Sequence, residues 1–186
     1  MRDKVEFHNT HIVLEMPSHI TKQIISIRKQ QKDDFRASLP VEITLAGSSG
    51  VGVLEPKQDS DKVFSKLHSI ALRTAPIKAA FGKVLRFPNT DIFAFTIKDE
   101  GPFHRLHEQI ADSGIFFLRS PYPYTPHCTL RSRSLVTEIE ANELFGLQIP
   151  DEFVLDTMSV LSLYQDSSTG EISVPVLHKV KLSGTI

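Results

Sequence analysis

Apolar positions along the chain recur with two spacings, and segments of each kind alternate. A spacing of two residues predicts strands, and a spacing of three to four residues predicts helices. We expect strands over residues 11–17, 41–46, 78–87, 91–98, 127–132, 152–166 and 171–182. We expect a first helix capped by Ser18 and a second that begins at Asp59 or Ser60 and ends before Pro76. Two further helices are expected over 102–112 and 138–144. Turns rich in glycine, proline, serine or asparagine separate these segments.

This order of elements predicts the fold class. Strands and helices alternate without the regular spacing of a parallel βαβ array, and hairpins are frequent, as at Pro88–Thr90. We therefore expect an α+β fold with mainly antiparallel sheets. No low-complexity segment or long linker divides the chain, so we expect residues 1–186 to form a single domain.

Two of the expected strands share a pattern of polar and apolar positions. Residues 41–45 read Val-Glu-Ile-Thr-Leu, and residues 126–130 read Pro-His-Cys-Thr-Leu. Side chains two residues apart on a strand point to the same face, which places Glu42 with Thr44, and His127 with Thr129 and Arg131. The similarity indicates two related lobes, a bilobal and duplicated fold whose sheets line a central cleft with their polar faces.

The residue types on these faces suit chemistry at a phosphate. His127 can give or take a proton near neutral pH, and Thr44 and Thr129 can donate hydrogen bonds to an oxyanion. Arg131 could supply a planar cation for phosphate, although a surface role is the commoner one for arginine. In the loop before His127, Tyr122 and Tyr124 could stack on a base or simply pack the loop.

Composition narrows the candidate partners and location. The formal net charge of the 186 residues is −1, which argues against a broad basic surface for duplex DNA. Cys128 is the only cysteine, so a disulfide within the chain and a cysteine zinc site are excluded. The sequence shows no membrane-spanning run and no secretory signal, and we expect a cytoplasmic monomer without a metal or cofactor.

Other motifs carry little weight. The run GSSGVG, residues 47–52, lacks the Lys-Ser/Thr ending of a Walker motif and is expected to be a flexible turn. His104 and His107, three residues apart on an expected helix, are interpreted as solvated side chains. His8 and His11 have the same spacing near a terminus that we expect to be mobile, and they receive the same interpretation.

The stretch Tyr-Pro-Tyr-Thr-Pro-His-Cys-Thr-Leu, residues 122–130, resembles the second signature of the 2H phosphoesterases. This superfamily includes 2'-5' RNA ligase-like proteins and cyclic nucleotide phosphodiesterases, with a His-x-Thr/Ser motif in each lobe of a bilobal α+β fold. The resemblance extends over nearly the whole chain. His127 and Thr129 match the second motif, and Thr44 matches the threonine of the first motif.

The resemblance implies hydrolysis, without a metal, of a 2',3'-cyclic or 2'-5' phosphodiester in RNA or a nucleotide. Glu42 departs from the pattern because it stands where the first motif has histidine. As a carboxylate it could be a general base, but it would repel a phosphate unless its pKa were raised. Three readings stay open: a hydrolase that uses Glu42, an impaired relative that binds RNA ends or nucleotides, and a site for another ligand that Glu42 recognises. Glu42 could also be a solvated strand residue.

Overall fold

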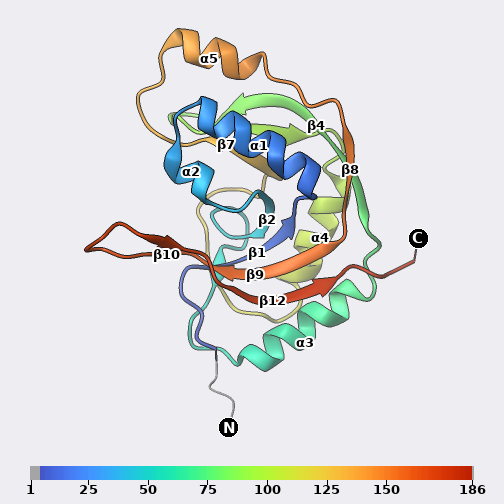
Figure 1. Cartoon of the computed structure of the whole chain (residues 1–186). Helices are drawn as coiled ribbons and strands as arrows, with labels where there is room; N and C mark the ends of the chain where they lie inside the picture. The colour runs from blue at the N-terminus through green and yellow to red at the C-terminus, as the bar shows by residue number, and fades with distance from the viewer. Residues whose placement is uncertain (1–4, 186) are drawn as a thin grey trace.

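The computed structural model describes residues 5–185 and contains two four-stranded antiparallel sheets (Figure 1). The first sheet has the order β12-β9-β1-β2, from β1 (Thr10–Glu15), β2 (Glu42–Ala46), β9 (Thr157–Ser162) and β12 (Val176–Lys181). The second has the order β7-β5-β4-β8, from β4 (Ile77–Arg86), β5 (Phe93–Ile97), β7 (His127–Arg131) and β8 (Glu152–Leu155). The predicted α+β class with mainly antiparallel sheets is confirmed.

Four of the five helices of the described residues lie where the apolar spacing predicts them. The five are α1 (Ser18–Gln30), the short α2 (Asp34–Ser38), α3 (Ser60–Ala71), α4 (Gly101–Ala111) and α5 (Glu138–Phe145). The sequence reading missed α2. The expected cap at Ser18 is wrong, because Pro17 occupies the N-cap of α1 without a side-chain bond. Asp59 does cap α3, with its carboxylate accepting from two backbone N–H groups.

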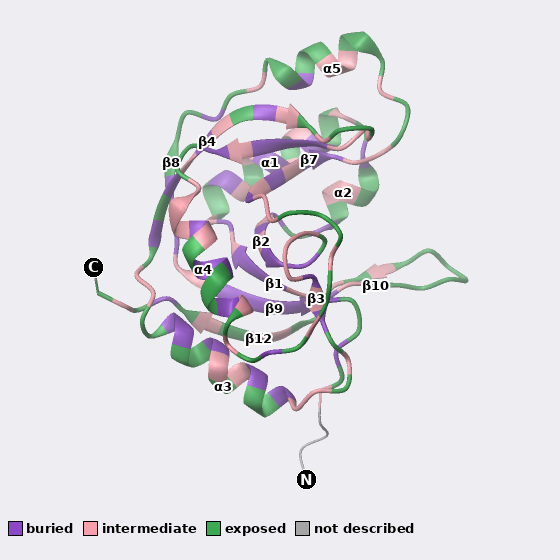
Figure 2. Cartoon of the chain, turned by 180° about the vertical axis from the view of Figure 1, so that it is seen from behind, coloured by how far each residue is buried: buried purple, intermediate pink, exposed green. Residues whose placement is uncertain are grey.

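The helices cover the sheets through their buried stripes. Figure 2 shows buried and exposed positions alternating along α3 and α4, with most of the buried colour on the strands. One continuous apolar core joins both sheets, and it includes Ile12 and Leu14 of the first sheet and Phe81 and Phe95 of the second. Burial of this shared apolar surface is the main term that holds the two sheets together.

The chain passes from one sheet to the other within a segment that we expected to be one long strand. Residues 152–166 divide into β8, β9 and the short β10 (Tyr164–Gln165), with β8 in the second sheet and β9 in the first. Asp156 lies at the crossing, where its carboxylate accepts from Thr157 and from Lys181 at 2.7 and 2.8 Å. The strand β10 pairs with β11 (Ile172–Ser173) in a hairpin that projects from the body (Figure 1).

A strand–helix–strand unit occurs twice. The first repeat, as we define it, is β1, α1 and β2, and the second repeat is β5, α4 and β7. In each repeat the two strands are antiparallel neighbours, and the last strand forms the edge of its sheet. Each helix packs near the last strand of the other repeat, α1 near β7 and α4 near β2. The duplication that the two sequence motifs indicate is therefore present in the topology.

Candidate active site

The two motif strands β2 and β7 belong to different sheets and lie side by side, with Cα atoms within 8 Å of each other. Their burial patterns are identical. In each strand the first and third residues are half-buried, and the other three are buried. The half-buried positions are Glu42 and Thr44 in β2, and His127 and Thr129 in β7. The predicted alternation at these four residues is confirmed.

A β-bulge interrupts each motif strand at the same place. In the first sheet Thr44 pairs with Val13 and Ala46 pairs with Ile12, which leaves Leu45 as an extra residue. In the second sheet Thr129 pairs with Ala94 and Arg131 pairs with Phe93, so that Leu130 is extra. The matching bulges strengthen the evidence for two related repeats.

The second bulge corrects the position expected for Arg131. Successive residues of β5 face opposite sides of the sheet, so the partners of Phe93 and Ala94 also face opposite sides. Arg131 is fully buried, with Nη1 3.5 Å from a carboxylate oxygen of Glu140 and Nη2 donating to a backbone carbonyl. The expectation that Arg131 shares the face of Thr129 is wrong, and its charge is already paired with that of Glu140.

Glu42 lies in a setting that favours its protonated form. Burial raises the pKa of its carboxyl above the ordinary value, although the Thr44 hydroxyl donates to Oε2 at 2.9 Å. A positive charge on His127, when that ring is protonated, and the charges of Arg28 and Arg36 act in the opposite direction and lower the pKa. Glu42 and His127 are therefore close enough to interact electrostatically across the two motif strands.

The imidazole of His127 is held in one tautomer. Its Nδ1 lies 2.7 Å from the carbonyl oxygen of Thr125, and because a carbonyl only accepts, Nδ1 carries the hydrogen. The ring of Phe87 packs edge-on against the imidazole at 4.9 Å between centroids. This arrangement leaves the lone pair of Nε2 for a ligand, since the described residues provide no hydrogen-bond partner for that atom.

The two tyrosines before His127 occupy different environments. The phenol of Tyr124 donates to the carbonyl oxygen of Thr44 at 3.2 Å, and burial raises its pKa. Its ring stacks on His107 with centroids 3.9 Å apart and planes 4° apart. Tyr122 is 67% exposed, and its carbonyl accepts from the backbone of Gly50. Tyr122 is thus free to contact a ligand, whereas Tyr124 is held within the protein.

The sequence reading missed Arg28, a fully buried residue of α1. Its Nε and Nη2 donate to the carbonyl oxygen of Thr129 at 3.1 and 2.9 Å. Its Nη1 donates to the carbonyls of Leu39 and Pro40, which lead into β2. One guanidinium therefore connects the approach to the first motif with the backbone of the second. A signal existed, because Arg28 continues the stripe of Ile20 and Ile24.

Two histidines that we expected to be solvated are not. His107 lies on the buried face of α4, 9% exposed, and its Nδ1 donates to the carbonyl oxygen of Leu45 at 2.7 Å. His11 lies within β1, half-buried, and burial lowers its pKa to about 4. Because Val13 pairs with Thr44, the alternation of β1 places His11 on the same face as Thr44. His104 and His8 are more open, as expected.

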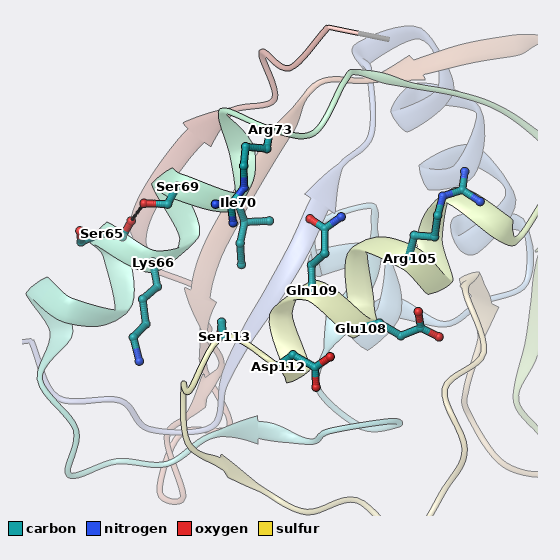
Figure 3. A pocket seen from close by; sticks show the side chains of 10 residues that line it. All are labelled: Ser65, Lys66, Ser69, Ile70, Arg73, Arg105, Glu108, Gln109, Asp112 and Ser113. Atoms are coloured by element: carbon teal, nitrogen blue, oxygen red, sulfur yellow. Dashed lines mark hydrogen bonds between the residues drawn. The ribbon is translucent and has the colours of Figure 1, made fainter.

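A pocket of about 560 Å³ lies between α3 and α4 (Figure 3). Its ten lining residues come from these two helices and the turns that follow them, and they include cations such as Arg73 and Arg105 as well as the acids Glu108 and Asp112. None of the four motif residues lines it. Within residues 5–185 no group of three or more histidine, cysteine or acidic side chains could hold a metal ion. No helix among these residues could span a membrane.

Comparison with known proteins decides the family. The sequence matches the 2'-5' RNA ligase superfamily over residues 16–167, most of the chain and both motif strands. The chain belongs to this superfamily. A search of curated proteins finds no match.

Several solved structures share the fold of this superfamily member. The protein TT0787 of Thermus thermophilus aligns with a TM-score of 0.71 and 18% identity, covering 95% of this chain and 99% of that one. Escherichia coli LigT complexed with NADP+ aligns with a TM-score of 0.62 and 16% identity, and the complex of LigT with 3'-AMP with 0.61 and 15%. Each LigT alignment covers 96% of this chain and 99% of LigT. At these identities the likeness establishes the fold.

Proposed function

We propose that the protein is a phosphodiesterase that opens a 2',3'-cyclic phosphate, or cleaves a 2'-5' phosphodiester, of RNA or a nucleotide. One observation carries the proposal: Glu42 and His127 occupy equivalent positions on two motif strands that come from different sheets and lie side by side. Thr44 and Thr129 stand beside them with the same burial. LigT, a member of the same fold, has been crystallised with 3'-AMP, a nucleotide that carries a ribose 3'-phosphate.

The tautomer of His127 suggests its role. Nδ1 holds its hydrogen on the carbonyl of Thr125, so Nε2 can accept a proton from a water molecule as that water attacks phosphorus. The hydroxyl of Thr129 can donate to a non-bridging oxygen of the phosphate and stabilise charge there, and the hydroxyl of Thr44 can do so once it turns away from Glu42. In this scheme His127 is the general base of the hydrolysis.

Glu42 can then act as the general acid. Burial raises the pKa of its carboxyl, so the protonated form persists to higher pH than for an ordinary glutamate. As the bond from phosphorus to the leaving ribose oxygen breaks, Glu42 donates its proton to that oxygen. The product is a phosphomonoester with a free hydroxyl. Solvent then returns a proton to Glu42 and removes one from His127, which completes the cycle.

Hydrolysis of 2',3'-cyclic AMP in the presence of EDTA tests the proposal. The wild-type protein should release a phosphomonoester, and His127→Ala should lose turnover by a factor of about 10² to 10⁴, the usual contribution of a general base. His8→Ala is the matched control, because His8 is an exposed histidine outside the motif strands. Equal rates in wild type and His127→Ala would refute the mechanism.

A second candidate function is supported by the carboxylate that faces Glu42 across the first sheet. Glu15 pairs directly with Glu42, so two acidic side chains stand on the same face of neighbouring strands. Ser159 and Lys179 hold Glu15 at 2.6 and 2.5 Å. This concentration of acid favours a non-catalytic binder of another ligand, one that offers Glu42 an amine or a hydroxyl, because neighbouring carboxylates repel a phosphate. Activity that appears only in Glu42→His would support the binder and contradict the hydrolase.

A further inference from the structure

The facing edges of β2 and β7 are bridged by side chains. The two strands belong to separate sheets, so the carbonyl groups along their facing edges need other donors. Tyr124 donates to the carbonyl of Thr44, and His107 donates to the carbonyl of Leu45. Arg28 donates twice to the carbonyl of Thr129. The spacing between the two motif strands is thus set by three side chains.

Each of these donors belongs to the opposite repeat. His107 lies on α4 and Tyr124 on the loop before β7, and both hold the first motif strand. Arg28 lies on α1 and holds the second motif strand. We propose that His107 and Tyr124 are positioning residues, which fix the first motif strand so that Glu42 and Thr44 meet the same phosphate as His127. This inference rests on the proposed function for its kinetic consequences.

The side chains of His107 and Tyr124 pack against each other as a pair. The rings of His107 and Tyr124 are stacked and nearly parallel, so neither can shift without the other. Gly50 closes over them with a φ of +68°, and a Cβ there would lie 2.3 Å from the His107 ring and 3.0 Å from Tyr124. Only glycine fits this approach, because both the left-handed backbone and the missing Cβ are needed. The glycine-rich run therefore packs, through Gly50, against the stacked rings of His107 and Tyr124. The sequence had predicted a flexible turn there.

The bonded carbonyls lie at the bulge of the first motif strand. Leu45 is the extra residue of that bulge, and Thr44 precedes it. A bulge disrupts the ladder and re-aims side chains, so its backbone needs support beyond the neighbouring strand. His107 and Tyr124 supply that support next to the side chain of Thr44, whose hydroxyl bonds to Glu42. Loss of either donor should displace both motif residues together.

Three variants test the proposal. His107→Leu and Tyr124→Phe each remove one donor, whereas His107→Asn places an amide N–H near the position of the imidazole Nδ1–H. We expect kcat for a 2',3'-cyclic nucleotide to fall about tenfold in the first two, since a displacement near 1 Å can cost up to about 10²-fold. We expect KM to change less than twofold, and His107→Asn to retain most of the wild-type kcat.

A second readout does not depend on turnover. The titration of the Glu42 carboxyl, followed by NMR of the folded protein, should move toward the ordinary range in His107→Leu and Tyr124→Phe and stay unchanged in His107→Asn. A merely structural role would lower the melting temperature without moving this titration. The inference is overturned if the titration is the same in all variants, or if His107→Asn behaves as His107→Leu. If wild type shows no turnover, the proposed function fails while the titration still decides the positioning role.

Discussion

The two motif strands differ in chemistry far more than in backbone. Both have the same burial pattern and the same bulge after the threonine. They differ in the residue two positions before that threonine, Glu42 against His127, and in the side chains that hold their edges. A guanidinium, which is always charged, holds β7, whereas a neutral phenol and an imidazole hold β2. The comparison teaches that one scaffold can keep its geometry while each half acquires its own proton chemistry.

Substitution of Glu42 should have the largest effect on the difference between the two motif strands. Glu42→Gln keeps the shape but cannot donate an acidic proton, so we expect kcat to fall by a factor of about 10² to 10⁴. Glu42→His makes the two motifs alike and should retain measurable hydrolysis of a 2',3'-cyclic nucleotide. Steady-state kinetics over a range of pH would check both variants. If Glu42→Gln hydrolyses as fast as wild type, Glu42 has no part in proton transfer.

Loss of the Arg28 contacts that hold β7 should lower the free energy of unfolding more than loss of the Tyr124 contact that holds β2. Arg28→Met should lower the free energy of unfolding by roughly 3 kcal/mol or more, because buried carbonyls at Thr129, Leu39 and Pro40 lose their donors. Tyr124→Phe removes one hydrogen bond and should cost about 1 kcal/mol. Urea unfolding monitored by circular dichroism would measure both. A larger loss in Tyr124→Phe than in Arg28→Met would contradict the contacts described above.

The raised pKa of Glu42 predicts a smaller, pH-dependent effect on stability. The folded protein binds the Glu42 proton more tightly than the unfolded chain does, so this group destabilises the fold as pH rises above about 4.5. Glu42→Gln should therefore be more stable than wild type at pH 7. The difference should vanish below about pH 4, where the carboxyl is protonated in both states. Melting curves at several pH values measure it, and a variant less stable at pH 7 would contradict the direction of the shift.

The titration of His11 gives stability a pH dependence of the opposite sign, which the same melting curves would measure. Its pKa falls from 6.5 to about 4 on folding, so the unfolded chain binds the proton more tightly. Stability should be lost as pH falls from 6.5 toward 4. His11→Gln should lessen this loss. The wild-type acid sensitivity in this range should persist unchanged in His8→Gln, the exposed neighbour. Equal acid sensitivity in His11→Gln and wild type would contradict the burial of His11.

Local sequence patterns predicted the helices and strands better than they predicted how these elements connect and pair. The apolar spacing placed α1, α3 and α4, and the alternation in the motif strands placed four site residues on the expected faces. The crossing at Asp156 depends on two sheets meeting, which no window of sequence contains. The position of Arg131 failed because a bulge reversed the alternation, and the bulge depends on the partner strand.

The sequence does contain a signal for the burial of Arg28 and His107, which was not predicted. Arg28 and His107 each occupy a position on the apolar stripe of its helix, where a polar residue must find a partner when it is buried. Their spacing from Ile24 and Phe103 is four residues in each case. What the sequence could not reveal is that the partner of each is the motif strand of the other repeat.

The most direct measurement of the central claim is a double-mutant cycle on hydrolysis of 2',3'-cyclic AMP in EDTA, with His127→Ala, Glu42→Gln and the double variant. If the two side chains act on one phosphodiester, their effects are far from additive, as for residues that work as a unit. The account predicts that the double variant is about as slow as His127→Ala alone. Losses that multiply, as for two independent sites, would contradict it.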